Sequence, residues 1–418
     1  MKIISRIAAM SVLFCSAVAG AQSGGSFYLK PTDRVVFYGD SITDQRLYTT
    51  FVETFVVTRF PKWKVDFVHS GWGGDRVTGG GGGPVDHRLE RDVFPYNPTV
   101  VTSMLGMNDG SYRAFDQGIF DTYAKGYEHI VQSLKAKLPG VRITLIQPSP
   151  YDDVTRKPNF EGGYNAVLVR YSEFLKDLSG RAGIDLADLN TSVVKQLRTA
   201  FAMDEAGSQK IVADRVHPGP GGHLLMAEAL LKAWKAPSLV SKVEIDVAGR
   251  KITTADNTAI SQVNIGPKIS WTQKDACLPM PIDMNDAPTA LCVKASDVVE
   301  ALDSEMLSVK GLARGNYALK IDGEKVGSYS HSELASGINL ALLNTPMKKQ
   351  AMAVHALTLK HNNIHFLRWR TVQVPYEKDN LPDMSKALAG LDKMEGDVVN
   401  LQRATASPKA HAYEVAPE

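Results

Sequence analysis

The sequence predicts an α/β protein in which helices cover both sides of an open parallel β-sheet, with a smaller β-rich domain and helices after it. Three observations support this prediction. Short apolar segments alternate with segments of helical periodicity from position 34 to about 234. Short strand-like stretches follow between positions 242 and about 344. After Pro346, apolar residues take the three-and-four spacing of an amphipathic helix.

Five short segments dense in apolar or β-branched residues predict the strands of the parallel sheet. They cover residues 34–38, 65–69, 99–105, 142–147 and 184–188. Apolar residues recur at helical intervals between positions 167 and 178, and a last helix is predicted from Gly221 to Trp234. In sheets built from β-α-β units, binding sites form beyond the carboxyl ends of the strands.

Polar residues stand at those strand ends. Ser41 follows the first strand, Gly74 the second and Asn108 the third, while Asp214 and His217 precede the last helix. Parallel topology alone brings the first three to one rim of the sheet. Ser41 is then either a nucleophile delivered to that rim or, with the aspartate before it, part of an ordinary helix N-cap.

The segments around these residues, taken together, resemble the SGNH branch of the GDSL hydrolases, which is named for a serine, a glycine, an asparagine and a histidine. The resemblance covers about the first 235 residues. The segments that carry it are Gly39-Asp40-Ser41-Ile42-Thr43, Ser70-Gly71-Trp72-Gly73-Gly74, Leu105-Gly106-Met107-Asn108-Asp109 and Asp214-Arg215-Val216-His217-Pro218-Gly219. It implies the three-layer α/β/α, flavodoxin-like SGNH fold and the hydrolysis of esters by a serine nucleophile.

A serine hydroxyl is a weak nucleophile until a base removes its proton, and the base needs an acceptor at its other ring nitrogen. His217 can be the base and Asp214 its partner, because their spacing within one turn lets both side chains face the same way. His217 could also be an ordinary loop residue before Pro-Gly. With the resemblance, Ser41, Asp214 and His217 are the expected catalytic residues, and no metal or cofactor is expected.

Attack on an ester carbonyl creates an oxyanion that needs hydrogen-bond donors. The backbone N–H groups of Ser41 and Gly74 and the side-chain amide of Asn108 are expected to supply three. The family's second block selects Gly74 over Gly73, whereas Asn108 could instead form a turn, since Asn-Asp-Gly favours turns. That block usually opens with asparagine, and this chain has His69 there, so the local bonding stays open.

Three further features invite an interpretation. Asp40 is expected to hold the turn before Ser41 by accepting backbone hydrogen bonds. The run Gly79 to Gly83 is expected to be a flexible loop, either a linker or a wall of the substrate entrance. His361 and His365 have the one-turn spacing of a metal pair, but the sequence offers no third ligand nearby, and a solvated helix face is the favoured interpretation.

The N-terminal segment has the pattern of a secretory signal peptide. A basic start precedes an apolar stretch and small residues, and cleavage is expected after Ala21. A lipid anchor at Cys15 is disfavoured because Phe14 precedes it.

No later segment has the length and apolarity of a membrane span, and a formal net charge of +2 over 418 residues gives no sign of a nucleic-acid partner. A secreted or periplasmic protein without stable membrane insertion is expected.

The chain is therefore divided into four predicted segments. These are a signal peptide over 1–21, a catalytic domain over 22–240, a β-rich accessory domain over 241–345, and a C-terminal helical segment over 346–418 with a loose tail after Ala404. Cys277 and Cys292 remain after removal of the signal peptide. In an oxidising compartment they would form a disulfide, or else remain two separate buried thiols.

The expected function is that of a secreted serine esterase that forms an acyl-enzyme on Ser41. The resemblance suggests a carbohydrate O-acetylesterase, with a small-molecule or polysaccharide ester as its substrate. A lipase, an arylesterase or a thioesterase of the same fold is the alternative among enzymes. A carbohydrate-binding protein that has kept the fold and lost the reaction is the alternative of another class.

Overall fold

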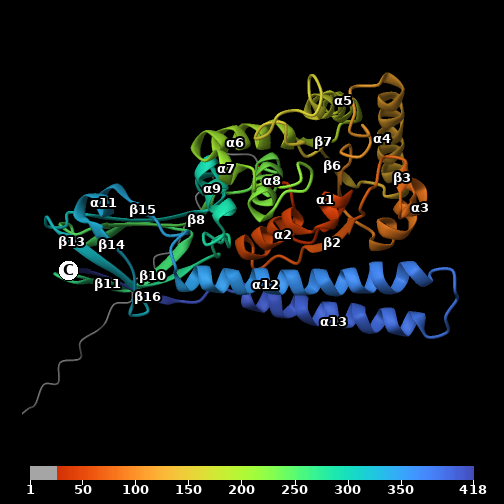
Figure 1. Cartoon of the computed structure of the whole chain (residues 1–418). Helices are drawn as coiled ribbons and strands as arrows, with labels where there is room; N and C mark the ends of the chain where they lie inside the picture. Colours follow the sequence, from red (N-terminus) through yellow and green to blue (C-terminus); the bar gives the residue numbers. More distant parts are fainter. Residues whose placement is uncertain (1–25) are drawn as a thin grey trace, which may run out of the picture.

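The computed structural model describes residues 26–418, and the expected signal peptide lies outside these residues. An α/β domain and a β-sandwich lie next to each other, and two long antiparallel helices run along the α/β domain (Figure 1). None of the helices in residues 26–418 is long and apolar enough to cross a membrane.

A five-stranded parallel sheet forms the centre of the α/β domain. Its strand order is β2-β1-β5-β6-β7, and all neighbouring strands are parallel. The strands are β1 (Arg34–Gly39), β2 (Asp66–Gly71), β5 (Val100–Met104), β6 (Arg142–Ile146) and β7 (Asp185–Ala187). All five predicted strands are confirmed. Because β1 lies between β2 and β5, the carboxyl ends of the three strands that precede the predicted site residues are neighbours.

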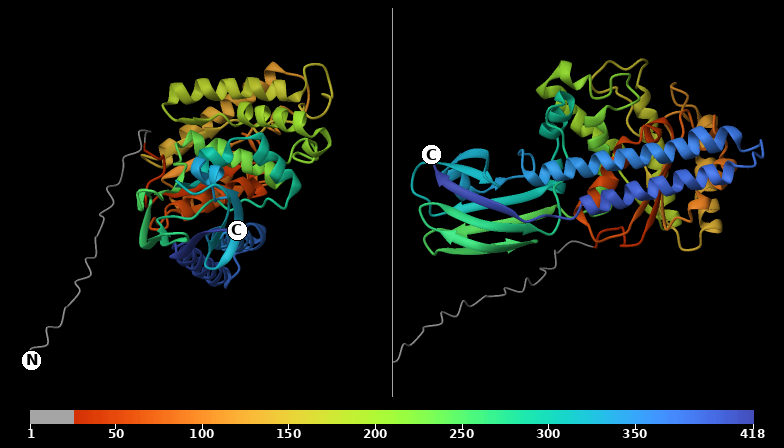
Figure 2. Two further views of the ribbon diagram at one scale, coloured as in Figure 1. Left: turned by 90° about the vertical axis from the view of Figure 1, so that its left-hand side faces the viewer. Right: turned by 90° about the horizontal axis from the view of Figure 1, so that it is seen from below.

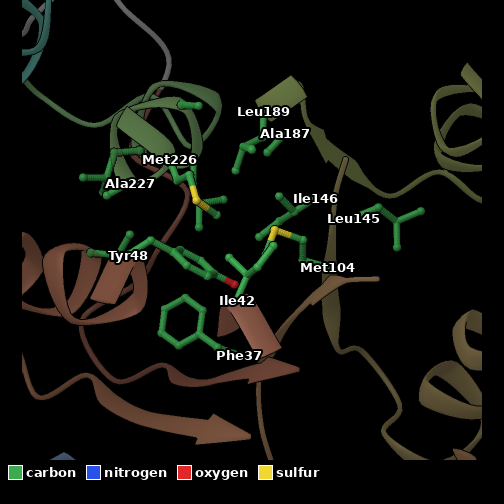
Figure 3. Close-up of a cluster of buried hydrophobic side chains, with 14 of the residues drawn as sticks. Phe37, Ile42, Tyr48, Met104, Leu145, Ile146, Ala187, Leu189, Met226 and Ala227 are labelled. Carbon is green, nitrogen blue, oxygen red and sulfur yellow. The ribbon is translucent and has the colours of Figure 1, made fainter. Parts of the chain in front are cut away.

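Helices alternate with these strands and cover the sheet, which confirms the predicted α/β architecture. They are α1 (Ser41–Asp44), α2 (Leu47–Arg59), α3 (Val85–Asp92), α4 (Gln117–Lys137), α5 (Tyr164–Ala182), α6 (Leu189–Met203), α7 (Glu205–Ser208) and α8 (Pro220–Ala233). The core reaches directly beneath α1, where Phe37, Ile42, Met104 and Met226 gather (Figure 3). Burial of these side chains holds the carboxyl end of β1 in place, and Ser41 follows directly after this end.

A mostly antiparallel β-sandwich follows the α/β domain. One sheet has the order β10-β11-β16-β13-β14 and the other β15-β12-β8-β9. Asp322 and Gly323 form the hairpin turn that joins β13 to β14. The strands are β8 (Leu239–Asp246), β9 (Lys251–Asp256), β10 (Thr258–Ile265), β11 (Ile269–Asp275), β12 (Ser304–Lys310), β13 (Asn316–Ile321), β14 (Glu324–Ser330) and β15 (Ile338–Asn339). The helices α9 (Ala287–Ala295), α10 (Val298–Leu302) and α11 (His331–Ser336) lie between strands in the sequence.

The end of the chain corrects the predicted loose tail. Residues His411–Pro417 form β16, the central strand of the five-stranded sheet, between β11 and β13. Tyr413 and Val415 are buried on its inner face, in the alternating pattern of a strand. The β-sandwich is thus completed by the C-terminus, outside the predicted range 241–345.

A helical hairpin connects the sandwich strands to this last strand. It consists of α12 (Pro346–Phe366), a π-helical segment η2 (Leu367–Gln373), a short turn η3 (Val374–Tyr376) and α13 (Met384–Thr405). The predicted helices after Pro346 are confirmed. Figure 2 shows α13 returning along α12 and the chain entering the sandwich again.

His361 and His365 correct the prediction of a solvated helix face. Their exposed fractions are 2% and 4%. His361 Nε2 pairs with Glu53 of α2, and Glu395 of α13 lies 3.5 Å from His361 Nδ1 and 3.6 Å from His365 Nδ1. The prediction was wrong because α13 folds back over this face of α12, a contact that the local spacing of residues does not reveal. These ion pairs fasten the hairpin to the α/β domain.

We expect this attachment to weaken as the pH rises above neutral. Burial acts to lower the pKa of His361, but Glu53 and Glu395 outweigh it and raise this pKa from 6.5 to about 9. The stabilisation by protonated His361 is therefore complete below about pH 6.5 and is lost as the pH rises through about 9. Between these pH values the Tm of the parent protein should fall by a few degrees more than that of a His361→Gln variant. Equal pH slopes of Tm in the two proteins would contradict this account.

The predicted disulfide is not formed. Cys277 and Cys292 are both free and buried. The Cys277 thiol donates to the carbonyl of Val240 at 3.4 Å, whereas Cys292 packs in the core of the α/β domain against Gly221. Because different neighbours hold the two side chains, the structure corresponds to the alternative of two separate thiols.

Candidate active site

Three of the predicted site residues form a chain of hydrogen bonds at the rim of the parallel sheet. The Ser41 hydroxyl lies 2.8 Å from His217 Nε2, and His217 Nδ1 lies 2.7 Å from Asp214 Oδ2. Ser41 opens α1 directly after β1, whereas Asp214 and His217 lie in the loop before α8. The fold therefore brings together groups that are 176 residues apart in the sequence.

The backbone at Ser41 is set by its two preceding residues. Asp40 is the N-cap of α1, and its Oδ1 accepts the N–H of Ile42 at 3.0 Å, which confirms the interpretation of Asp40 as a turn residue. A side chain at Gly39 would approach the carbonyl oxygen of Met104 to 2.7 Å, so β1 and β5 need glycine here. Burial raises the pKa of Asp40 to about 8. Burial therefore favours the uncharged form of this carboxyl.

Asp214 holds His217 through both carboxylate oxygens. Oδ1 accepts the backbone N–H groups of Val216 at 2.9 Å and His217 at 2.7 Å, while Oδ2 accepts from the ring. Partial burial acts to raise the pKa of Asp214, but the hydrogen bonds from His217 outweigh it and hold this pKa below its usual 3.8. An ionised Asp214 favours the ring form that carries its proton on Nδ1. Nε2 is then free to accept the proton of Ser41.

Gly74 and Asn108 lie on the same rim, after β2 and β5. Asn108 Nδ2 donates to the carbonyl of Asp75 at 3.0 Å, and its Oδ1 accepts the hydroxyl of Tyr112 at 3.0 Å. These two bonds identify Nδ2 as the donor atom of the amide and Oδ1 as its acceptor atom. Gly74 has φ of +78°, a left-handed conformation that favours glycine. One N–H of the Asn108 amide remains for a ligand.

The neighbouring glycine has its N–H occupied. Gly73 donates to Asp44 Oδ2 at 3.1 Å. Asp75, the residue after Gly74, is held by Arg88, whose Nε lies 2.7 Å from Asp75 Oδ2. This bonding favours Gly74 over Gly73 as the source of a free backbone donor.

His69, which stands in place of the family's asparagine, bonds away from the site. Its ring is buried and lies 2.7 Å from Thr49 Oγ1 and 3.0 Å from Glu53 Oε2. Both partners belong to α2. His69 therefore ties β2 to α2, and through Glu53 it also joins the network that fastens the helical hairpin.

The glycine run does not form the flexible loop predicted from its composition. It folds into a small antiparallel hairpin of β3 (Gly79–Gly80) and β4 (Gly83–Pro84). Gly82 lies against Trp72 and Arg88 so closely that a Cβ there would come within 2.6 Å of each side chain. Glycine thus serves close packing in this hairpin.

Two residues that contact Asn108 or the Gly73-Gly74 segment were not identified from the sequence. Asp44 accepts from Gly73, and Tyr112 donates to Asn108. Each lies within four residues of a family motif, on the same loop or helix. Their proximity to the motifs is a signal that could have identified them, although the spacing alone does not show where the side chains point.

The comparison with known families agrees with this geometry. Residues 37–225 match the GDSL-like lipase/acylhydrolase family. This range includes Ser41, Gly74, Asn108, Asp214 and His217. The chain therefore contains a GDSL-like lipase/acylhydrolase domain, and the protein is an ester-hydrolysing enzyme.

The chain is also similar to several individual proteins. An acetylxylan esterase of Geobacillus stearothermophilus is 22% identical over 218 residues, which are 48% of this chain and 93% of that enzyme. The solved structure of a gut microbial diltiazem-metabolizing enzyme is 25% identical, with a TM-score of 0.81 over 96% of this chain and 100% of that chain. The crystal structure of another acetyl xylan esterase is 23% identical, covers 48% of this chain and 98% of that one, and has a TM-score of 0.39. The match to the diltiazem-metabolizing enzyme therefore extends beyond the α/β domain over nearly the whole chain.

Proposed function

We propose that this esterase removes acetyl groups from carbohydrate esters through an acyl-enzyme on Ser41. The observation that carries the proposal is the hydrogen-bonded chain from Asp214 through His217 to Ser41. In the proposed reaction, His217 Nε2 takes the proton of Ser41 as Oγ attacks the ester carbonyl. His217 then gives this proton to the departing alcohol, and water releases the acyl group by the same route.

The proposed oxyanion site consists of three donors. The backbone N–H groups of Ser41 and Gly74 and Nδ2 of Asn108 would face the oxygen that becomes negatively charged during attack. The bond from Asn108 to the Asp75 carbonyl supports this assignment, because it holds the amide beside Gly74. Preorganised donors lower the barrier because they need not reorient when the charge forms.

Acetyl as the acyl group is supported by a relative's specificity. The Geobacillus stearothermophilus protein that matches almost over its full length is named an acetylxylan esterase. We therefore propose an acetylated polysaccharide, such as xylan, as the substrate class.

Tyr112 supports a sugar as the alcohol part of the ester. Its side chain is 44% exposed, and its hydroxyl bonds to Asn108. Ser111 and Tyr112 both have left-handed backbones, with φ of 57° and 54°. Such conformations cost roughly 1–3 kcal/mol in residues other than glycine and cluster at functional sites. An exposed ring held in this way offers a flat surface on which the apolar face of a sugar can pack.

A substrate panel tests the proposed specificity. We expect kcat/KM for p-nitrophenyl esters to be highest for acetate and to fall with increasing chain length, and we expect release of acetate from acetylated xylan. A preference for long acyl chains would favour the lipase alternative. Binding of xylan without turnover of any ester would favour the carbohydrate-binding alternative.

Two variants of Tyr112 separate its two proposed contributions. Tyr112→Phe keeps the ring but removes the bond to Asn108, so kcat on p-nitrophenyl acetate should fall about tenfold with little change in KM. Tyr112→Leu also removes the ring, so KM for acetylated xylan should rise severalfold, while KM for p-nitrophenyl acetate should match that of Tyr112→Phe. Parallel changes of KM on both substrates would contradict a role in sugar binding.

We also propose that residues 1–21 direct export of the protein. Expression in a bacterial host with an intact secretion pathway should give an exported protein that begins at Gln22. Retention of the uncleaved chain in the cytoplasm would contradict the proposed localisation.

A further inference from the structure

The helical hairpin reaches the active-site rim through its π-helical segment η2. The guanidinium carbon of Arg370 lies 3.0 Å from the centre of the Trp72 ring. The ring of Trp369 meets Trp72 edge-on at 5.7 Å, and its Nε1 donates to Asp92 of α3. Trp72 directly precedes Gly73 and Gly74 in the chain. A segment near the C-terminus therefore packs on the loop that carries a proposed oxyanion donor.

The same arginine also faces the helix that begins with Ser41. Arg370 Nη2 lies 4.0 Å from Asp44 Oδ2. This carboxylate oxygen is the one that accepts the N–H of Gly73 at 3.1 Å. Asp44 is the last residue of α1, and Ser41 is the first. One guanidinium thus contacts both of the elements that supply backbone donors to the proposed oxyanion site.

Arg46 also holds the hairpin at this place. Arg46, just after α1, donates to the carbonyl of Asn362 at 3.2 Å and to the side chain of Asn363 at 3.0 Å. Its guanidinium also lies over the ring of Phe366 at 4.4 Å. The end of α12 is therefore fixed against the turn between α1 and α2, and Arg370 follows within one turn of η2.

Arg370 differs from its neighbour on the same segment. Arg368 points to Asp392 of α13, 2.7 Å away, and makes no bond to the α/β domain among those found for residues 26–418. Arg370 is turned to Trp72 and Asp44, and its Nη1 is buried without a hydrogen-bond partner. The seven residues of η2 are π-helical, a rare geometry that is frequent at functional sites.

We propose that Arg370 is a positioning residue for the oxyanion site, which acts by holding Trp72 and Asp44 together and so fixes the Gly73-Gly74 segment relative to Ser41. The inference rests on the proposed function, and it assigns a role in that reaction to the C-terminal hairpin. Burial acts to raise the pKa of Asp44, and Arg370 acts against this rise. The positive charge thereby favours the ionised carboxylate, which is the stronger acceptor for the Gly73 N–H.

Three substitutions test this role. Arg370→Met keeps most of the length and packing of the side chain but removes its charge, Arg370→Lys keeps the charge, and Arg368→Met is the matched control on the same segment. With p-nitrophenyl acetate, Arg370→Met should lower kcat about tenfold or more with KM changed less than about twofold. Arg370→Lys should recover part of that kcat, and Arg368→Met should retain the parent's kcat. The Tm values of the two methionine variants should be similar.

Two results would overturn the proposal. One is an unchanged kcat in Arg370→Met. The other is a loss of kcat in Arg370→Met that Arg370→Lys does not relieve and that Arg368→Met shares, since this would indicate a general weakening of the hairpin. Failure of the proposed function would look different, because the parent protein itself would then show no ester hydrolysis that depends on Ser41.

Discussion

Replacement of Ser41 by alanine should lower kcat/KM for p-nitrophenyl acetate by roughly 10⁴-fold or more. The hydroxyl removed is the one that lies 2.8 Å from His217 Nε2, and no other atom of the residue can form the acyl-enzyme. The fold should tolerate the change, because Asp40 still caps α1 and Ile42 still packs in the core. Steady-state rates and thermal unfolding, measured on the same preparation, check both expectations.

Ser41 and His217 should act together in one catalytic step, so that the loss of either removes the contribution of both. His217→Ala should cause a loss of similar size, and the double variant Ser41→Ala/His217→Ala should lose little more than either single variant. Ser261→Ala, at an exposed serine of β10, should keep the parent's rate. Residual activity of Ser41→Ala above about a tenth of the parent's, or losses that multiply in the double variant, would contradict the proposed mechanism.

Replacement of Asn108 by alanine should lower kcat by roughly 10²- to 10³-fold, with a much smaller change in KM. The amide donor is proposed to interact with the oxyanion, which exists only during the reaction, so its loss should affect turnover more than binding. The Asp75 carbonyl and the Tyr112 hydroxyl already orient this amide in the absence of substrate. Measurement of kcat and KM for p-nitrophenyl acetate tests whether kcat falls much more than KM changes.

A nearly isosteric variant controls for the change in size. Asn108→Asp keeps the volume and an acceptor for Tyr112, but it replaces the donor by a carboxylate that would repel the oxyanion. Its loss of kcat should be at least as large as that of Asn108→Ala. If both variants turned over at nearly the parent's rate while Ser41→Ala was inactive, Asn108 would be a turn residue, which is the alternative the sequence leaves open.

The parallel sheet and the arrangement at its rim could be predicted because their signals are local. Each strand of the sheet is a short apolar segment, and each site residue follows a strand or precedes a helix within a few positions. Once the strands are parallel and β1 lies between β2 and β5, the carboxyl ends of these three strands must lie side by side. The positions of Ser41, Gly74 and Asn108 then follow without any contact having to be known.

Two of the mispredicted features depend on contacts between distant segments. His361 is buried because α13 covers it and because Glu53, 308 positions earlier, accepts from it. Strand β16 finds its partners in β11 and β13, although its seven residues stand alone at the end of the chain. The contact of Arg370 with Trp72, about which no prediction was made, likewise joins segments that are far apart in the chain. No periodicity or motif near these residues carries the information about their partners.

Covalent trapping tests the identity of the nucleophile most directly. The parent protein would be treated with a fluorophosphonate, which transfers its phosphonyl group to an activated serine with loss of fluoride, and then digested for mass spectrometry. We expect a single adduct, located on Ser41, that is absent from Ser41→Ala and forms far more slowly in His217→Ala. An adduct on another residue, or labelling of Ser41→Ala at the parent's rate, would contradict the assignment of Ser41 as the nucleophile.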